Sequence, residues 1–151
     1  MQILDSTAIK ELLDRLQRVR PETRALWGKM NAHQMVCHLN DAFDLAMGAK
    51  TASEDISFLN RTLIRWVALR APVPWPKGVP TRPEMDQLAG GTPPIEFAQD
   101  KATLAAAIDR FARKPRTFEF SRHPFFGDLT EWEWMRWGYL HANHHFRQFG
   151  A

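Results

Sequence analysis

The chain has 151 residues, 44% of them hydrophobic, and its 20 basic and 17 acidic side chains give a net charge of +3. This length predicts one domain, 1–151, that can bury an ordinary core, and the single Cys37 cannot form an internal disulfide. No apolar run approaches the roughly 18 residues that span a membrane, no secretory signal precedes the first helix, and the basic residues are too scattered to indicate nucleic acid binding. We therefore expect a cytoplasmic protein that binds neither membranes nor nucleic acid.

Two helices are expected in the first third of the chain. Apolar residues at helical spacing predict a helix over about 6–19, with Ser6 or Thr7 as its cap. Asn31 and, three residues later, Gln34 form the pattern of a capping box, which predicts that a second helix begins there. An apolar stripe along this second helix indicates the face that it buries.

The middle of the chain contains a third apolar segment and then a long loop. Residues of roughly 55–69 are apolar around much of the helix circumference, so we expect a largely buried third helix. The stretch 72–94 carries seven of the ten prolines and shows no helical or strand period. Long loops of this kind are often functional, and this one could wrap the bundle or cover a cleft.

Helix signals return in the last third of the chain. A helix is expected from about Asp100, capped there or at an adjacent residue, and a short extended and turn-rich element over 117–127 follows it. Thr130 and Glu133 form a second capping-box pattern, which predicts a last helix that runs to about residue 149. Four or five helices without a convincing sheet predict an all-α, antiparallel helical bundle.

Three of the six histidines lie close together near the end of the last helix. His141 and His145 are four residues apart, so they lie about 40° apart on one helix face and can share a metal ion. His38 lies on the apolar side of the second helix, whereas His33 lies about 140° away from it and is expected to meet solvent. His38 is therefore the better third ligand, and His144 is a more doubtful neighbour.

Three imidazoles around a divalent ion, with water in an open position, form the arrangement of catalytic zinc sites. Zinc or nickel is the most favoured ion, and iron or cobalt would also accept nitrogen ligands. Asp41 and Gln148 lie at spacings that allow them to orient the imidazole rings, and Asp41 and His144 are candidate catalytic groups. Simpler roles stay open: a hydrogen-bonded core histidine for His38, a surface carboxylate for Asp41, a solvated ring for His144, and a buried inert thiol for Cys37.

Aromatic residues offer two further candidates near this site. Trp134 shares a helical stripe with the histidine pair and could wall a pocket, although core packing explains most of the tryptophans. The Phe125–Gly127 turn could line the mouth of the site or plug one end of the bundle.

The histidine pattern resembles that of the DinB/YfiT-like superfamily. A histidine in the second helix, here His38 within 30–39, is followed by His141, His145 and then Gln148. Further segments look like one branch of the superfamily, a domain family of unknown function: 27–30, 34–35, 76–81, 123–127 and 144–150. The resemblance extends over nearly the whole chain.

This resemblance implies a four-helix bundle, often dimeric, with a divalent metal held by His38, His141 and His145. Members include metal-dependent thiol transferases that use low-molecular-weight thiols such as bacillithiol, and a mycothiol-dependent maleylpyruvate isomerase. The leading hypothesis is a metal-dependent enzyme that activates a thiol or water for transfer to, or hydrolysis of, a small molecule. The alternative is a metal-stabilised bundle that acts as a binding or dimerisation module, and we expect a homodimer in either case.

Overall fold

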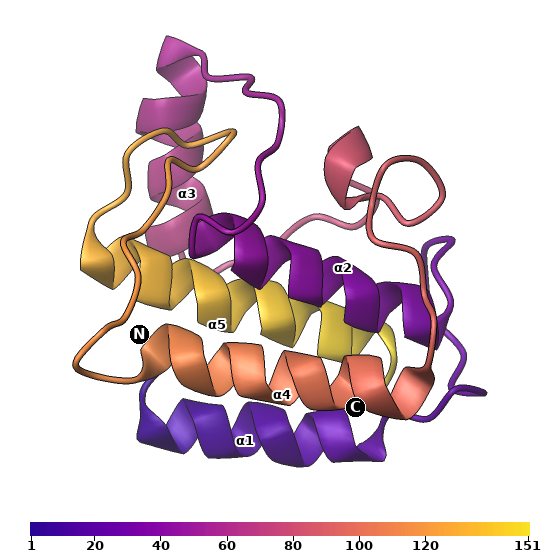
Figure 1. The fold of residues 1–151 in the computed structure, drawn as a ribbon. Coiled ribbons are helices and arrows are strands. Elements are labelled where there is room, and N and C mark those ends of the chain that lie inside the picture. Colours follow the sequence, from indigo (N-terminus) through magenta and orange to yellow (C-terminus); the bar gives the residue numbers. More distant parts are fainter.

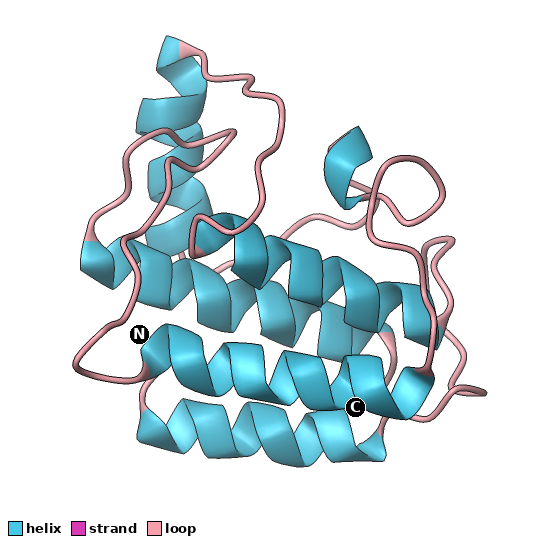
Figure 2. Ribbon diagram, viewed as in Figure 1, coloured by secondary structure: helices cyan, strands magenta, loops and turns pink.

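The computed structural model describes all residues, 1–151, and it is all-helical, with five α-helices and no strand (Figures 1 and 2). Long loops connect the helices, and a single β-bridge joins His123 to Gly127. None of the helices combines the length and the apolar character that crossing a membrane requires. The helices are α1 (Ser6–Arg18), α2 (Ala32–Ala46), α3 (Arg65–Arg70), α4 (Phe97–Ala112) and α5 (Glu131–Gln148).

The four long helices enclose a common core. Both α1 and α2 pack against α4 and against α5, so each long helix has two long neighbours (Figure 1). The interior contains 27 buried apolar residues, and burying each large side chain contributes about 1.5–3 kcal/mol to folding. Its largest fully buried side chains are Trp134, Phe43, Phe111 and Phe146.

Both predicted capping boxes are confirmed, and they begin the two helices that carry the histidines. Asn31 Oδ1 accepts the Gln34 N–H at 2.8 Å, and Gln34 Oε1 accepts the Asn31 N–H at 2.9 Å. At the start of α5, Thr130 Oγ1 accepts the Glu133 N–H, and the Glu133 carboxylate accepts the Thr130 N–H. These reciprocal bonds satisfy backbone donors that a helix start otherwise leaves free.

The caps of the other two long helices differ from the predicted ones. Asp5, rather than Ser6 or Thr7, caps α1 by accepting the Ala8 N–H at 2.9 Å. Glu96 caps α4, so this helix begins before the predicted Asp100. In both cases a carboxylate just outside the helix accepts N–H groups of the first turn, a role that any of several adjacent polar residues can fill.

The third segment was expected to be largely buried, and this prediction is wrong. It forms the π-helical turn η1 (Asn60–Ile64) and the short α3, which stands at an angle to the long helices (Figure 1). Of its apolar side chains, Phe58 is 75% exposed and Trp66 is 58% exposed, whereas Leu69 is buried. Because α3 packs against α5 alone among the long helices, most of its circumference has no partner to cover it.

The loop 72–94 contains only the 3-10 turn η2 (Pro83–Met85), as the absence of a periodic pattern predicts. This turn packs against α2. The loop therefore lies against α2 at this turn, and it brings a backbone carbonyl to the histidine cluster described next.

Candidate metal centre

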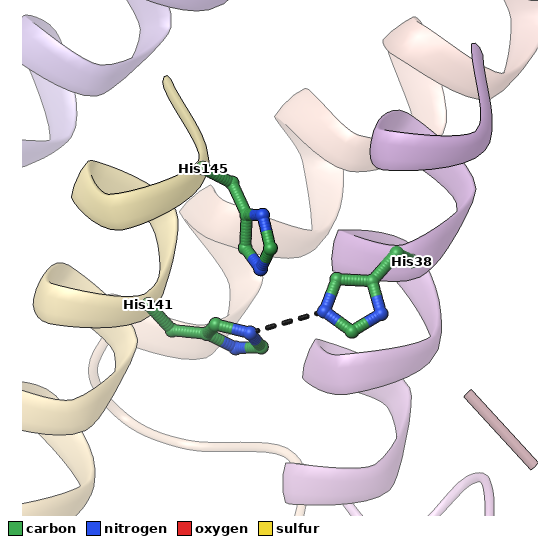
Figure 3. Close-up of side chains that lie close together, drawn as sticks. All are labelled: His38, His141 and His145. Carbon is green, nitrogen blue, oxygen red and sulfur yellow. Dashed lines mark hydrogen bonds between the residues drawn. The ribbon is translucent and has the colours of Figure 1, made fainter. Parts of the chain in front are cut away.

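His38, His141 and His145 point toward one another from two helices (Figure 3). His38 extends from α2, and the other two extend from successive turns of α5. Their ring centroids lie 4.7–5.1 Å apart, and His38 Nε2 lies 3.1 Å from His141 Nε2. One nitrogen from each of the three rings lies within 4.8 Å of the other two. The sequence prediction that these three histidines meet is borne out by this geometry.

Hydrogen bonds on the far side of two rings fix which nitrogen faces the cluster. His38 Nδ1 lies 2.9 Å from the Met85 carbonyl, which can only accept, so Nδ1 carries the proton. Gln148 Nε2 donates to the Trp27 carbonyl at 2.7 Å, which orients its Oε1 to accept from His145 Nδ1 at 2.8 Å. Both rings therefore turn an unprotonated Nε2 inward.

The spacing of these nitrogens fits a divalent metal ion. Metal–nitrogen bonds of about 2.05 Å at tetrahedral angles place two ligand atoms about 3.3 Å apart. The observed Nε2–Nε2 separation of 3.1 Å between His38 and His141 is close to this value. Without a metal, the inward His38 Nε2 is an acceptor, so His141 must donate its Nε2 proton to it.

Burial keeps the three imidazoles neutral. It lowers the pKa of His38, and it lowers the pKa values of His141 and His145 well below their ordinary range, with the neighbouring rings adding to the effect. A charged imidazolium would lose its hydration in this interior. The neutral imidazole is also the form that binds a metal.

Asp41 does not contact the His38 ring, although its spacing along α2 allows it. Its buried carboxylate instead holds the loop that presents the Met85 carbonyl to His38. It binds Gln87 Nε2 at 2.8 Å, Thr92 N at 2.8 Å, Thr92 Oγ1 and Lys50 Nζ at 2.8 Å. Asp41 thus acts on the cluster through the position of the loop, whereas Gln148 touches a ring directly, as predicted.

His144 lies outside the cluster and faces a neighbouring cavity of about 310 Å³. The Trp75 ring lies between the histidine cluster and this cavity. Its centroid is 5.9 Å from the His141 centroid and 6.2 Å from the His144 centroid. Burial, and then the nearby Arg147, lowers the pKa of His144. The cavity wall includes Trp27, Trp75, Lys77, His144 and Arg147.

The aromatic wall of the histidine cluster is formed by Trp137, and Trp134 has the core-packing role that we expected for most of the tryptophans. Trp137, one helical turn before His141, places its ring centroid 4.8 Å from the imidazole, whereas Trp134 is fully buried in the core. Two turns separate Trp134 from His141, so the nearer residue on the same stripe makes the contact. The buried His123 packs against Phe126, in agreement with the plug interpretation of the Phe125–Gly127 turn.

A second group of ligating atoms escaped the sequence prediction. His33, expected to meet solvent, places its Nε2 2.7 Å from Asp100 Oδ2, and Cys37 Sγ lies 3.6 Å from the same oxygen. Burial, followed by the charge of Asp100, raises the pKa of the Cys37 thiol to about 12, which agrees with the predicted buried and unreactive thiol. The sequence did contain one sign of this group, because His33 and Cys37 are four residues apart and therefore share one face of α2.

Comparison with known proteins identifies a family. A family model described as "Protein of unknown function (DUF1569)" matches residues 1–151. Neither the curated proteins nor the solved structures include a match. Over its whole length, the chain belongs to the DUF1569 family.

Proposed function

We propose that the protein is a metal-dependent enzyme of the DinB-like superfamily, built as an antiparallel four-helix bundle. In this proposal His38, His141 and His145 hold a divalent ion, zinc or nickel in the first place and iron or cobalt as alternatives. The observation that carries it is the convergence of three imidazoles whose Nε2 atoms share one small volume. The outward hydrogen bonds to Met85 and Gln148 support it further, because they preset the rings for binding.

A divalent ion at this position would supply Lewis acidity, which lowers the pKa of a thiol or a water molecule that binds it. The protein's own contribution begins with ligand charge, since three neutral imidazoles cancel none of the positive charge of the ion. Trp75 and Trp137 cover His141 and exclude bulk water from that side. Such a dry and positive environment favours an anionic nucleophile.

The cavity beside the cluster supports a small molecule as substrate. Its volume of about 310 Å³ lies at the lower end of the range for small-molecule sites. Lys77 and Arg147 in its wall favour anionic groups, and Trp27 and Trp75 favour apolar ones. His144 stands between this cavity and the His145 ring and has a lowered pKa, so it is the candidate acceptor for the proton of the nucleophile.

We propose thiol transfer or hydrolysis as the reaction class, with a low-molecular-weight thiol or water as the nucleophile. Both reactions need the same parts: a metal that activates the nucleophile, a proton acceptor and a pocket for the electrophile. The superfamily resemblance favours the thiol.

A second candidate is a non-catalytic module in which the metal only joins α2 to α5. The exposed apolar side chains of Phe58, Leu63 and Trp66 favour a dimerisation role for such a module. A homodimer is compatible with either function. The two candidates differ in whether the ion retains a coordination position for a substrate.

The test measures metal content and thiol consumption in protein purified without an affinity tag. Because Cys37 belongs to the second group of ligating atoms, the variants are made in a Cys37→Ser parent. We expect about one metal per chain in the parent, and little in its His38→Ala and His145→Ala derivatives. His144→Ala is the matched control, which should retain the metal but consume thiol more slowly with a panel of electrophiles. Full metal content in both ligand variants would overturn the proposal.

A further inference from the structure

Outside the histidine cluster, a second set of three different ligating atoms lies together between α2 and α4. His33 Nε2, Cys37 Sγ and Asp100 Oδ2 all lie within 4.8 Å of one another. His33 and Cys37 are four residues apart on one face of α2, and Asp100 lies in the first turn of α4, which packs against α2. Nitrogen, thiolate sulfur and carboxylate oxygen are all ligands that zinc accepts.

Contacts from outside the trio fix its members in place. Asn40, one turn after Cys37 on α2, donates its side-chain N–H to the Asp100 carbonyl at 3.0 Å, which ties the start of α4 to α2. The Ile95 N–H donates to Asp100 Oδ2 at 3.2 Å, and the His33 ring packs edge-on against Phe97, with centroids 5.3 Å apart. The three ligating atoms are therefore brought together by the packing of the two helices.

From this geometry we infer that His33, Cys37 and Asp100 form a second, structural divalent metal site that clamps α2 to α4. Zinc bonds of about 2.05 Å to oxygen and 2.3 Å to sulfur, at a tetrahedral angle, separate the two ligands by about 3.6 Å. The observed distance from Cys37 Sγ to Asp100 Oδ2 is 3.6 Å. His33 Nε2 and Asp100 Oδ2 are now 2.7 Å apart. On zinc binding this distance must increase to about 3.3 Å, the separation of any two nitrogen or oxygen ligands in a tetrahedral zinc site.

Charge and exposure both suit such a site. A thiolate and a carboxylate together cancel the two positive charges of the ion, so binding leaves no net charge at this partly buried position. The metal replaces the thiol proton of Cys37, which is released to water, and it replaces the hydrogen bond between His33 and Asp100. The His33 and Asp100 side chains are 21% and 23% exposed, so water can enter and complete the coordination shell.

This inference does not depend on the proposed enzymatic function, because none of its ligands belongs to the histidine cluster. It assigns Cys37 a structural ligand role in place of that of an inert thiol. The competing interpretation is an ordinary His33–Asp100 ion pair beside a buried thiol.

A cobalt titration of the metal-stripped, untagged protein separates these interpretations. Cobalt bound to a thiolate gives a charge-transfer band in the near ultraviolet, and cobalt bound to imidazoles alone does not. Because Cys37 is the only cysteine, this band reports the second site alone. We expect the band in the wild type and in His38→Ala, and we expect Cys37→Ser to abolish it.

Two further variants keep the test decisive if Cys37→Ser folds poorly. His33→Ala and Asp100→Asn change partly exposed side chains and should each weaken the cobalt affinity read from the band at least tenfold. Asp109→Asn, which alters an exposed carboxylate on the same helix, is the matched control and should leave the affinity unchanged. The absence of the band at saturating cobalt, or an unchanged affinity in both His33→Ala and Asp100→Asn, would overturn the inference. A wild type that binds one cobalt without the band would refute this site and leave the proposed function intact.

Discussion

His38 and Cys37 are adjacent in α2, yet they belong to two groups of ligating atoms with opposite properties. The group of His38 consists of three neutral imidazoles, of which those of His38 and His145 are buried, whereas the group of Cys37 offers a thiol and a carboxylate and is partly exposed. Neutral ligands leave the charge of a metal available to a substrate, and anionic ligands cancel it. The catalytic role that we propose for the first group and the structural role that we infer for the second both rest on this difference.

The two groups also differ in how they are satisfied without a metal. In the second group the carboxylate of Asp100 already has His33 as a partner. In the first group His38 and His145 use Nδ1 for bonds to the protein, and His38 Nε2 accepts a hydrogen bond from the neutral His141 ring, so that no charged partner is involved. A metal therefore has less to displace at the histidine cluster, and we expect tighter binding there.

The largest expected effect is the stabilisation of the fold by metal. At a free zinc concentration about a thousandfold above the Kd of the histidine cluster, zinc binding should raise the free energy of unfolding by about 4 kcal/mol. The gain should persist for the most part in Cys37→Ser and disappear for the most part in His38→Ala. Urea denaturation in zinc buffers measures it. A gain that persists in His38→Ala and disappears in Cys37→Ser would contradict tighter binding at the histidine cluster.

The two carboxylates that serve these groups should differ in their effect on stability. Asp41 is nearly fully buried and holds Lys50 and the loop, so Asp41→Ala should lower the free energy of unfolding by roughly 3 kcal/mol. Asp100 is partly exposed, and Asp100→Ala should cost about 1 kcal/mol in metal-free protein. Chemical denaturation gives both values, and faster hydrogen exchange at the Thr92 amide in Asp41→Ala would report release of the loop. Equal losses would contradict the assigned roles.

Gln148 tests whether hydrogen bonds outside the cluster tune the metal. Its loss in Gln148→Ala frees the His145 ring and should weaken zinc binding 10- to 100-fold, or about 1.4–2.7 kcal/mol. Gln17→Ala, at an exposed position of α1, is the control. Competition with a chelator measures the affinity. An unchanged affinity would show that the His145 ring is held by packing alone.

His123 separates the effect of burial from that of metal binding, because it is buried but belongs to neither group. Burial, followed by the charge of Arg65, lowers its pKa from 6.5 to about 3. Between these values the unfolded chain binds a proton that the folded chain does not, so the free energy of unfolding falls as the pH decreases. Below pH 6.5, this residue alone should lower the free energy of unfolding by up to about 1.4 kcal/mol for each pH unit.

The variant His123→Asn removes this titration. The asparagine Oδ1 can accept the Phe125 and Phe126 N–H groups that now bind His123 Nδ1 at 3.1 Å. Urea denaturation of zinc-loaded protein between pH 6.5 and 5 should therefore show a shallower pH dependence for the variant. Parallel curves for variant and wild type would contradict a neutral, buried His123.

Local patterns made much of the fold and the histidine cluster predictable from the sequence. The capping boxes at Asn31 and Thr130 involve residues three positions apart, and the pairing of His141 with His145 follows from helix geometry alone. His38 was identified because it shares a face with the apolar residues of α2. Each of these inferences needs only the knowledge of which face of a helix is buried.

The features that sequence reasoning missed depend on contacts between distant segments. The apolar pattern of 55–69 indicates a helix but does not say whether a partner covers it, and Phe58 and Trp66 remain exposed. The hydrogen bond between His33 and Asp100 joins residues 67 positions apart. The loop whose side chains and backbone bind the Asp41 carboxylate has no periodic pattern that would predict this contact. Such contacts arise from the packing of the helices and not from local spacing.

X-ray absorption spectroscopy of untagged protein loaded with one equivalent of zinc tests the central claim most directly. We predict a shell of nitrogen and oxygen atoms at about 2.0–2.1 Å that includes three imidazoles and at least one ligand from solvent. A sulfur scatterer at about 2.3 Å would show that the first ion binds Cys37, and would contradict the histidine cluster as the primary metal centre.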